Sequence, residues 1–216
     1  VETLRDDSLR RSLPFRIGFP DSMPKSVIHR LIEPALHVER PGRLVCREAP
    51  LAELLAELAV HRLDLVIADR PMPANISVRG YSTLLGESTL TVFAASALAA
   101  RLAEGFPATL DGAPFLLPGE DVAHRGALLQ WFETQRVQPS IVAELDDSAL
   151  MKAFGQGGAG AFAAPTSIAD HIHRQYGLQA VGEITEVGSQ VYAITTERRL
   201  SHPAMQAIRS AAVKMS

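Results

Sequence analysis

Five carboxylates in this 216-residue chain follow short apolar runs, where β-strands are predicted to end. They are Asp21, Glu48, Asp69, Glu120 and Asp121. Hard cations such as sodium prefer oxygen ligands, by the same logic as calcium and magnesium, so Asp69 and Glu120 in particular are candidate cation ligands. A structural interpretation also holds, because Asp21 or Ser22 could cap the helix that follows them, Asp121 could cap a later helix, and charges at strand ends are commonly solvated.

Two arginines accompany these carboxylates and suggest a different ligand. Arg70 and Arg125 could pair with an organic anion, assisted by backbone donors at the starts of helices. The other candidates for such a ligand site are Ser22, Met23, Ala49, Gly119 and Ser148. A cation, an organic anion and the absence of any tight ligand remain open as alternatives.

Other patterns for catalysis or cofactor binding lack their central signal. The glycine-rich run 155–160 stands between a predicted helix and a predicted strand, which is the reverse of a phosphate-binding loop and favours a helix end with a tight turn. His171 and His173 are two residues apart on a predicted helix and point to different faces, so no zinc site is predicted. The sequence has no Gly-x-Ser-x-Gly motif, so no serine hydrolase is predicted. No acid/base or nucleophile constellation supports an enzyme of another kind, so we expect neither an enzyme nor a cofactor.

Composition excludes several further classes of protein. The formal net charge is −3 and no basic run occurs, which argues against a nucleic-acid-binding surface. The single cysteine, Cys46, excludes an internal disulfide and is predicted to be a small core residue on a buried strand, in keeping with the cytoplasm. No apolar stretch reaches the roughly 18 residues that a membrane span requires. The polar residues 1–14 are predicted to be the remnant of a linker.

The candidate residues would be positioned by strands that alternate with helices. The run Leu63–Ala68 is almost entirely apolar and rich in branched side chains, which is typical of a parallel strand buried on both faces. Together with strands at Phe15–Phe19 and Leu44–Arg47, and a helix at Lys25–Leu36 that Pro34 should kink, it predicts β-α-β-α-β with parallel strands. Ligands in such sheets bind beyond the carboxyl ends of the strands.

A second set of alternating elements follows. The predicted strands are Ser88–Ala95, Pro114–Leu117, Ser140–Leu145, Ala159–Ala163, Leu178–Ile184 and Gln190–Thr196. Helices are predicted after Asp121, at Ser148–Phe154 with Asp146 or Asp147 as cap, at Thr166–Tyr176 and at Pro203–Val213. The whole predicts an α/β fold of two βαβ lobes, 15–91 with 192–216 and 92–191, crossed twice by the chain around a ligand cleft.

Several motifs resemble a known family. The segments LDLVIADRP, FGQGGAGAF followed by Ala164-Pro165, and QVYAITTERRLSHPAMQAI are similar to the effector-binding domain of LysR-type transcriptional regulators, over Phe15–Val213. This family has the fold of type 2 periplasmic binding proteins. More narrowly, RLIEPAL, PFLLPGED and ELDDSALMKAFGQGGAG resemble those members that activate genes of sodium/proton antiporters, which implies a response to sodium, lithium or alkaline stress.

The resemblance also implies partners. The family binds DNA through an N-terminal winged helix-turn-helix domain, which is expected to be absent here because nothing before Phe15 could form one. A homodimer or homotetramer would form through the helix Lys25–Leu36 and the strand Leu44–Arg47 against the other lobe of a second subunit. The alternative function is that of a periplasmic solute-binding protein for a small organic anion.

Overall fold

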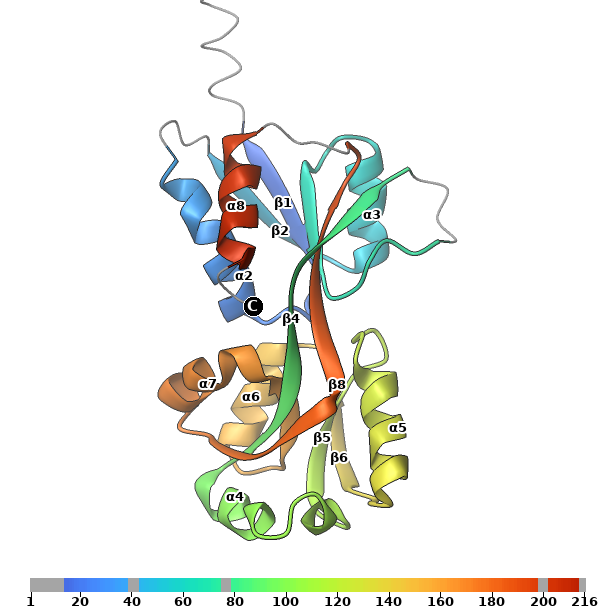
Figure 1. The fold of residues 1–216 in the computed structure, drawn as a ribbon, viewed down its shortest axis with the longest axis vertical. Coiled ribbons are helices and arrows are strands. Elements are labelled where there is room, and N and C mark those ends of the chain that lie inside the picture. The colour runs from blue at the N-terminus through green and yellow to red at the C-terminus, as the bar shows by residue number, and fades with distance from the viewer. Residues whose placement is uncertain (1–13, 39–42, 75–78, 198–201, 214–216) are drawn as a thin grey trace, which may run out of the picture. The chain divides into compact units, whose positions relative to one another are not determined.

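The computed structural model describes residues 14–38, 43–74, 79–197 and 202–213, and none of the helices described there is long and apolar enough to cross a membrane. The predicted linker at 1–14 lies almost wholly outside these residues. The chain forms two compact units, which consist of residues 1–86 with 191–216 and of residues 87–190 (Figure 1). Two separate stretches of sequence therefore build unit 1, whereas unit 2 is one continuous segment. The long strands β4 (Tyr81–Ala94) and β8 (Gln179–Thr195) each belong to both units.

Unit 1 is a sheet with helices on its faces. Its other elements are β1 (Phe15–Phe19), α2 (Lys25–Ile32), η1 (Glu33–Leu36), β2 (Leu44–Glu48), α3 (Leu51–Ala59), β3 (Leu65–Ala68) and α8 (Pro203–Val213). The strand order is β2-β1-β3-β8, with β1 parallel to both β2 and β3 and with β8 antiparallel to β3. The predicted β-α-β-α-β arrangement with parallel strands is confirmed.

The burial of β3 explains why its sequence is so uniformly apolar. All four of its residues are buried, and Leu54, Leu55 and Leu58 of α3 pack against Val66 from one side. Helix α8 packs beside α2 and η1 (Figure 1). The predicted kink is also confirmed, because Pro34 lies at the start of η1, where the α-helix tightens into a 3₁₀ turn.

Unit 2 repeats the alternation of strands and helices. Its elements are α4 (Ser96–Ala103), η2 (Ala108–Leu110), β5 (Pro114–Pro118), α5 (Arg125–Gln135), β6 (Ser140–Leu145), α6 (Ser148–Gln156), β7 (Phe162–Pro165), η3 (Thr166–Ile168) and α7 (Ala169–Tyr176). β5 is parallel to β6 and has a parallel bridge from Phe115 to Ala161, whereas β7 pairs with β4 in antiparallel register. The predicted second set is therefore present.

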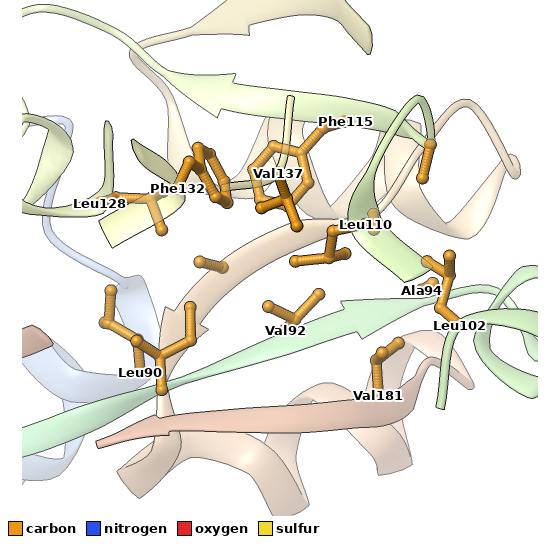
Figure 2. Packing of buried hydrophobic residues seen from close by; sticks show 14 of the residues in the cluster. Leu90, Val92, Ala94, Leu102, Leu110, Phe115, Leu128, Phe132, Val137 and Val181 are labelled. Carbon is orange, nitrogen blue, oxygen red and sulfur yellow. The ribbon is translucent and has the colours of Figure 1, made fainter. Parts of the chain in front are cut away.

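The two faces of β4 have different roles in unit 2. Leu90 and Val92 lie in the main hydrophobic cluster, and Figure 2 shows them on the side of Phe115 and Phe132. The intervening side chains point to the opposite face, where Phe93 contacts Phe162 with ring centroids 6.0 Å apart.

Four strand predictions were wrong in their limits. The two strands predicted at Leu178–Ile184 and Gln190–Thr196 are one continuous strand, β8, because the polar residues between them remain extended. β4 begins at Tyr81 rather than Ser88, and β7 covers Phe162–Pro165 rather than Ala159–Ala163. The glycines before β7 form the predicted helix end and turn, with Gly157 as the C-cap and Gly158 at φ +79°.

The prediction for Cys46 was wrong as well. β2 lies at the edge of the sheet with β1 as its only strand neighbour in the sheet order, and four of its five residues, including Cys46, are exposed. A short run such as Leu44-Val45-Cys46 cannot distinguish an edge strand from a buried one, because that difference depends on what the rest of the chain covers.

Candidate functional site

The carboxyl ends of β1, β2 and β3 share one edge of the sheet in unit 1, because these strands are parallel. Asp69 follows β3 there, and its side chain is only 11% exposed. Ser22 Oγ donates to Asp69 Oδ2 at 3.3 Å, and Arg70 Nε donates to Asp69 Oδ1 at 3.1 Å. Both carboxylate oxygens of Asp69 therefore accept a hydrogen bond. Three of the predicted site residues, Ser22, Asp69 and Arg70, are in contact with one another.

Glu48 at the end of β2 also has a cationic partner. It forms an ion pair with Lys25, whose Nζ lies 5.8 Å from the centroid of the Phe19 ring. Both side chains are more than a third exposed, so the pair contributes at most about 1 kcal/mol to stability. Negative charge at this edge is thus offset by Lys25 and Arg70.

The remaining predicted residues of unit 1 have different environments. Asp21 is exposed, whereas Met23 and Ala49 are buried, with 1% and 8% of their surface exposed. The prediction that Asp21 or Ser22 caps the following helix was wrong, since the N-cap of α2 is Pro24 and no side chain caps it. The Ser22 hydroxyl instead donates to Asp69.

In unit 2, β5 and β6 are parallel and end side by side. Asp147 Oδ1 accepts hydrogen bonds from the amides of Ala149 and Leu150, at 2.7 and 2.8 Å, so the predicted cap of α6 is confirmed and is Asp147. Ser148 Oγ is buried and has no hydrogen-bond partner among the described residues. The helix start therefore places an uncommitted hydroxyl group next to the end of β6.

Gly119, which directly follows β5, lies close to the side chain of Asp146. A Cβ atom built on Gly119 would lie 1.6 Å from Asp146 Oδ1. The Gly119 amide donates to the Leu145 carbonyl at 3.0 Å. The absence of a side chain at this position lets the two strand ends approach closely.

Arg125 donates hydrogen bonds to two acceptors in unit 2. Its Nη1 donates to the Pro118 carbonyl and to Glu144 Oε2, the latter at 2.9 Å. Glu120 and Asp121 are exposed. The prediction that Asp121 caps α5 was wrong, because that helix starts later than predicted, with His124 at the N-cap and no side-chain cap.

Sequence reasoning missed two polar features of unit 2. Lys152 is 5% exposed, and its Nζ donates to the Ser148 carbonyl at 3.2 Å. Burial lowers the pKa of His171 on α7, and the nearby charge of Lys152 lowers it further. The sequence signal for this buried lysine was its position: Lys152 follows Met151 on the face of α6 that packs into the core.

The second missed feature is a group of hydroxyls at the end of β7. Thr166 Oγ1 lies 2.8 Å from both Thr89 Oγ1 and Thr91 Oγ1. The signal was the alternation of Thr89 and Thr91 with apolar residues along β4, which places both on one face. The strand ends of unit 1 and those of unit 2 thus each carry side chains whose hydrogen-bonding groups and charges are suited to binding a small polar ligand.

Comparisons with known proteins agree with this architecture. The family model described as "LysR substrate binding domain" matches residues 10–215. The chain is 31% identical over 197 residues to the transcriptional activator protein NhaR of Escherichia coli (strain K12) and, at the same identity, to that of Shigella flexneri. This match covers 91% of the chain but only 64% of each of these relatives, so the chain spans about two thirds of their length.

Solved structures share the fold at low identity. The reduced regulatory domain of OxyR2 from Vibrio vulnificus has a TM-score of 0.71 at 14% identity, over 95% of this chain and 97% of that one. The effector-binding domain of QuiR in complex with shikimate has a TM-score of 0.64 at 16% identity, over 94% and 96%. The regulatory domain of HypT from Salmonella typhimurium has a TM-score of 0.68 at 15% identity, over 94% and 95%.

The fold is therefore that of LysR regulatory domains, which are like type 2 periplasmic binding proteins. The family match decides between the two predicted functions in favour of the regulator and against the periplasmic solute-binding protein. Since the family model covers nearly the whole sequence, this chain belongs to the LysR substrate-binding domain family.

Proposed function

We propose that the full protein is a NhaR-like transcription activator that binds DNA through a domain outside this chain and senses a small effector through this one. The observation that carries the proposal is the set of polar side chains at the carboxyl ends of parallel strands, above all Asp69 with its partners Ser22 and Arg70. A regulator of this kind works when its effector binds one conformation of the domain more tightly than another.

The effector is a small cation, such as sodium or lithium, or a small organic anion. Asp69 in unit 1 and Glu120 in unit 2 are each a proposed cation ligand, whereas Arg70 in unit 1 and Arg125 in unit 2 are each proposed to bind an anion. An anion would have to compete with the carboxylates that these arginines already contact, Asp69 and Glu144. A cation would find Glu120 exposed at the end of β5.

Thermal unfolding tests whether such an effector exists. The chain is unfolded in the chlorides of lithium, sodium, potassium and choline at matched ionic strength, and then with small organic acids as choline salts. A ligand at about 100 times its Kd should add roughly 2.7 kcal/mol, which raises the Tm of a chain of this size by very roughly 5–10 °C. Asp69→Asn should abolish a cation effect and Arg70→Ala an anion effect. Identical curves with every salt and acid would contradict effector sensing.

We also propose that two exposed strand edges form the oligomer interface. In unit 1, β2 exposes Val45, and Leu36 at the end of η1 is 50% exposed. In unit 2, the edge strand β6 exposes Ile141 and Val142 by 41% and 49%. Exposed strand edges with apolar side chains favour association, and pairing of the unit 1 edge of one subunit with the unit 2 edge of the other would occur twice in a symmetric dimer.

Sedimentation velocity tests this interface with one matched pair of substitutions. Val142→Glu places a charge within the proposed interface and should convert dimers to monomers. Val60→Glu is the control, because Val60 is 62% exposed at the end of α3, on neither edge strand. Dimers that persist in Val142→Glu, or that are lost equally in both variants, would contradict the proposed interface.

A further inference from the structure

The N-terminus of α8 is capped by a titratable side chain. Pro203 is the first helical residue, and the His202 carbonyl accepts hydrogen bonds from the amides of Met205 and Gln206, at 3.0 and 3.3 Å, so His202 is the N-cap. Its ring nitrogen Nδ1 accepts a further hydrogen bond, from the Ala204 amide at 3.2 Å. The preferred N-cap residues are Ser, Thr, Asp and Asn, whose side-chain oxygens remain acceptors near neutral pH. A histidine at this position differs from them, because one added proton removes its acceptor.

The capping hydrogen bond requires the neutral form of the imidazole. A backbone amide can only donate, so Nδ1 must accept, and the single ring proton is on Nε2. Protonation of the ring adds a proton to Nδ1, and the Ala204 amide then loses its acceptor. It also places a positive charge at the positive end of the helix dipole. Both effects disfavour the protonated ring as long as the cap is in place.

The ring of His202 also contacts the first strand of unit 1. It stacks on Phe15, with ring centroids 4.5 Å apart and ring planes inclined by 17°. Phe15 is 3% exposed, and its amide donates to the Arg43 carbonyl at 2.9 Å. The stack therefore joins the start of α8 to the start of β1, in addition to the packing of α8 beside α2 and η1.

Asp64 provides a charge that competes with the cap. Its Oδ2 accepts a hydrogen bond from the Arg16 amide at 2.7 Å, and its own amide donates to the Arg16 carbonyl at 2.9 Å, so the carboxylate is held beside β1. Burial lowers the pKa of His202, and the charge of Asp64 opposes that change. The elements around His202 and α8 carry further charged or titratable side chains, namely Arg16, Lys25, His29, Arg30, Glu33, His37, Arg62 and Arg209. Within the described part of the chain, Asp64 is the one residue whose charge shifts the pKa of His202.

We propose that His202 is a proton-sensitive N-cap that makes the attachment of α8 to unit 1 depend on pH. In its neutral form it binds the Ala204 amide and stacks on Phe15. When it is protonated, it gives up the Ala204 amide and is attracted to Asp64, so that the start of α8 loosens as the solution becomes acidic. The proton is the ligand in this proposal, which is independent of the effector.

Hydrogen exchange of the α8 amides tests the cap. Exchange is followed by mass spectrometry on a peptide that covers Pro203–Val213, at pH 7.5 and 5.0, and is expressed as protection factors, which remove the intrinsic pH dependence of exchange. Between these pH values the protection of the parent chain should fall about three- to tenfold, which is the effect of losing one N-cap hydrogen bond. His202→Asn supplies an acceptor that cannot be protonated, so its protection should stay nearly constant.

Two further variants and a matched control complete the experiment. His202→Ala lacks any acceptor and should have the lower protection already at pH 7.5. Asp64→Asn keeps an acceptor for the Arg16 amide but removes the charge, so the NMR titration of the His202 ring should move to lower pH. His37→Asn is the control, because His37 is exposed at the end of η1 and is not part of the α8 cap. It should retain the pH dependence of the parent chain.

Four results would overturn the proposal. Protection that is the same at both pH values in the parent chain would contradict release by protonation. Equal loss of protection in the parent chain and in His202→Asn would assign the pH dependence to another group. Parent-like protection of His202→Ala at pH 7.5 would show that the cap contributes nothing. A His202 ring that titrates at or above pH 6.5 would contradict its neutral state in the folded chain.

Discussion

Gly160, which precedes β7, is a position in unit 2 where one added methyl group should meet backbone atoms and lower stability. A Cβ atom there would lie 2.9 Å from the carbonyl oxygen of Pro114 and 3.0 Å from its carbon. That carbonyl also accepts the hydrogen bond from the Ala161 amide at 2.9 Å, which holds β7 against β5. Both groups belong to the backbone, so no change of rotamer can relieve the contact, and Gly160→Ala must shift one strand away from the other.

The expected cost follows from the size of that overlap. Overpacking by one carbon atom in a well-packed interior costs about 1–3 kcal/mol, which for a chain of this length lowers the Tm by very roughly 2–12 °C. Gly126→Ala is the same chemical change at a position with nothing within 4 Å of the added Cβ, inside α5. Alanine is favoured over glycine in helices by up to about 1 kcal/mol, so Gly126→Ala should stabilise unit 2.

Urea unfolding measures both variants in one assay. Trp131, the single tryptophan, is 5% exposed in the core of unit 2, so its fluorescence reports the unfolding of that unit. The urea midpoint should fall for Gly160→Ala and rise for Gly126→Ala at a similar slope. Equal midpoints for Gly160→Ala and the parent chain would show that β5 and β7 are less closely packed than described and would refute the reasoning.

Three further predictions concern single contacts. Asp147→Ala should lower the stability of unit 2 by about 1 kcal/mol, seen as a lower urea midpoint, because two amides of α6 lose their cap. Gly119→Ala should force the side chain of Asp146 away, and pairing it with Asp146→Ala in a double-mutant cycle should recover part of the lost stability. Burial lowers the pKa of His202 below 6.5, against the opposing charge of Asp64, so the neutral imidazole is favoured in the folded state. Its contribution to stability is complete above pH 6.5 and is lost as pH falls through the lowered pKa, so His202→Asn should show a shallower loss of Tm between pH 7.5 and 5.

The edge of the sheet where the carboxyl ends of the parallel strands lie was largely predictable from the sequence. Apolar runs such as Leu65–Ala68, followed at once by charged residues, predicted strand ends, and parallel strands bring those ends to one edge. The resemblance of a few motifs then identified the family, which the family model confirms over residues 10–215.

Local sequence determined the periodic elements, because hydrophobic periodicity, proline positions and capping residues act over a few residues. β1 and α8 have the predicted limits, and Asp147 caps α6 as one of the two predicted candidates. Only the tertiary structure decided which strands lie at an edge, so the exposure of Cys46 on β2 was not predictable. It also decided which side chain each polar group meets: Ser22 donates to Asp69 instead of capping α2, and Thr89 meets Thr166, 77 residues away. The physical reason is that a hydroxyl bonds to whichever acceptor folding brings within about 3 Å, and separation along the chain does not reveal that acceptor.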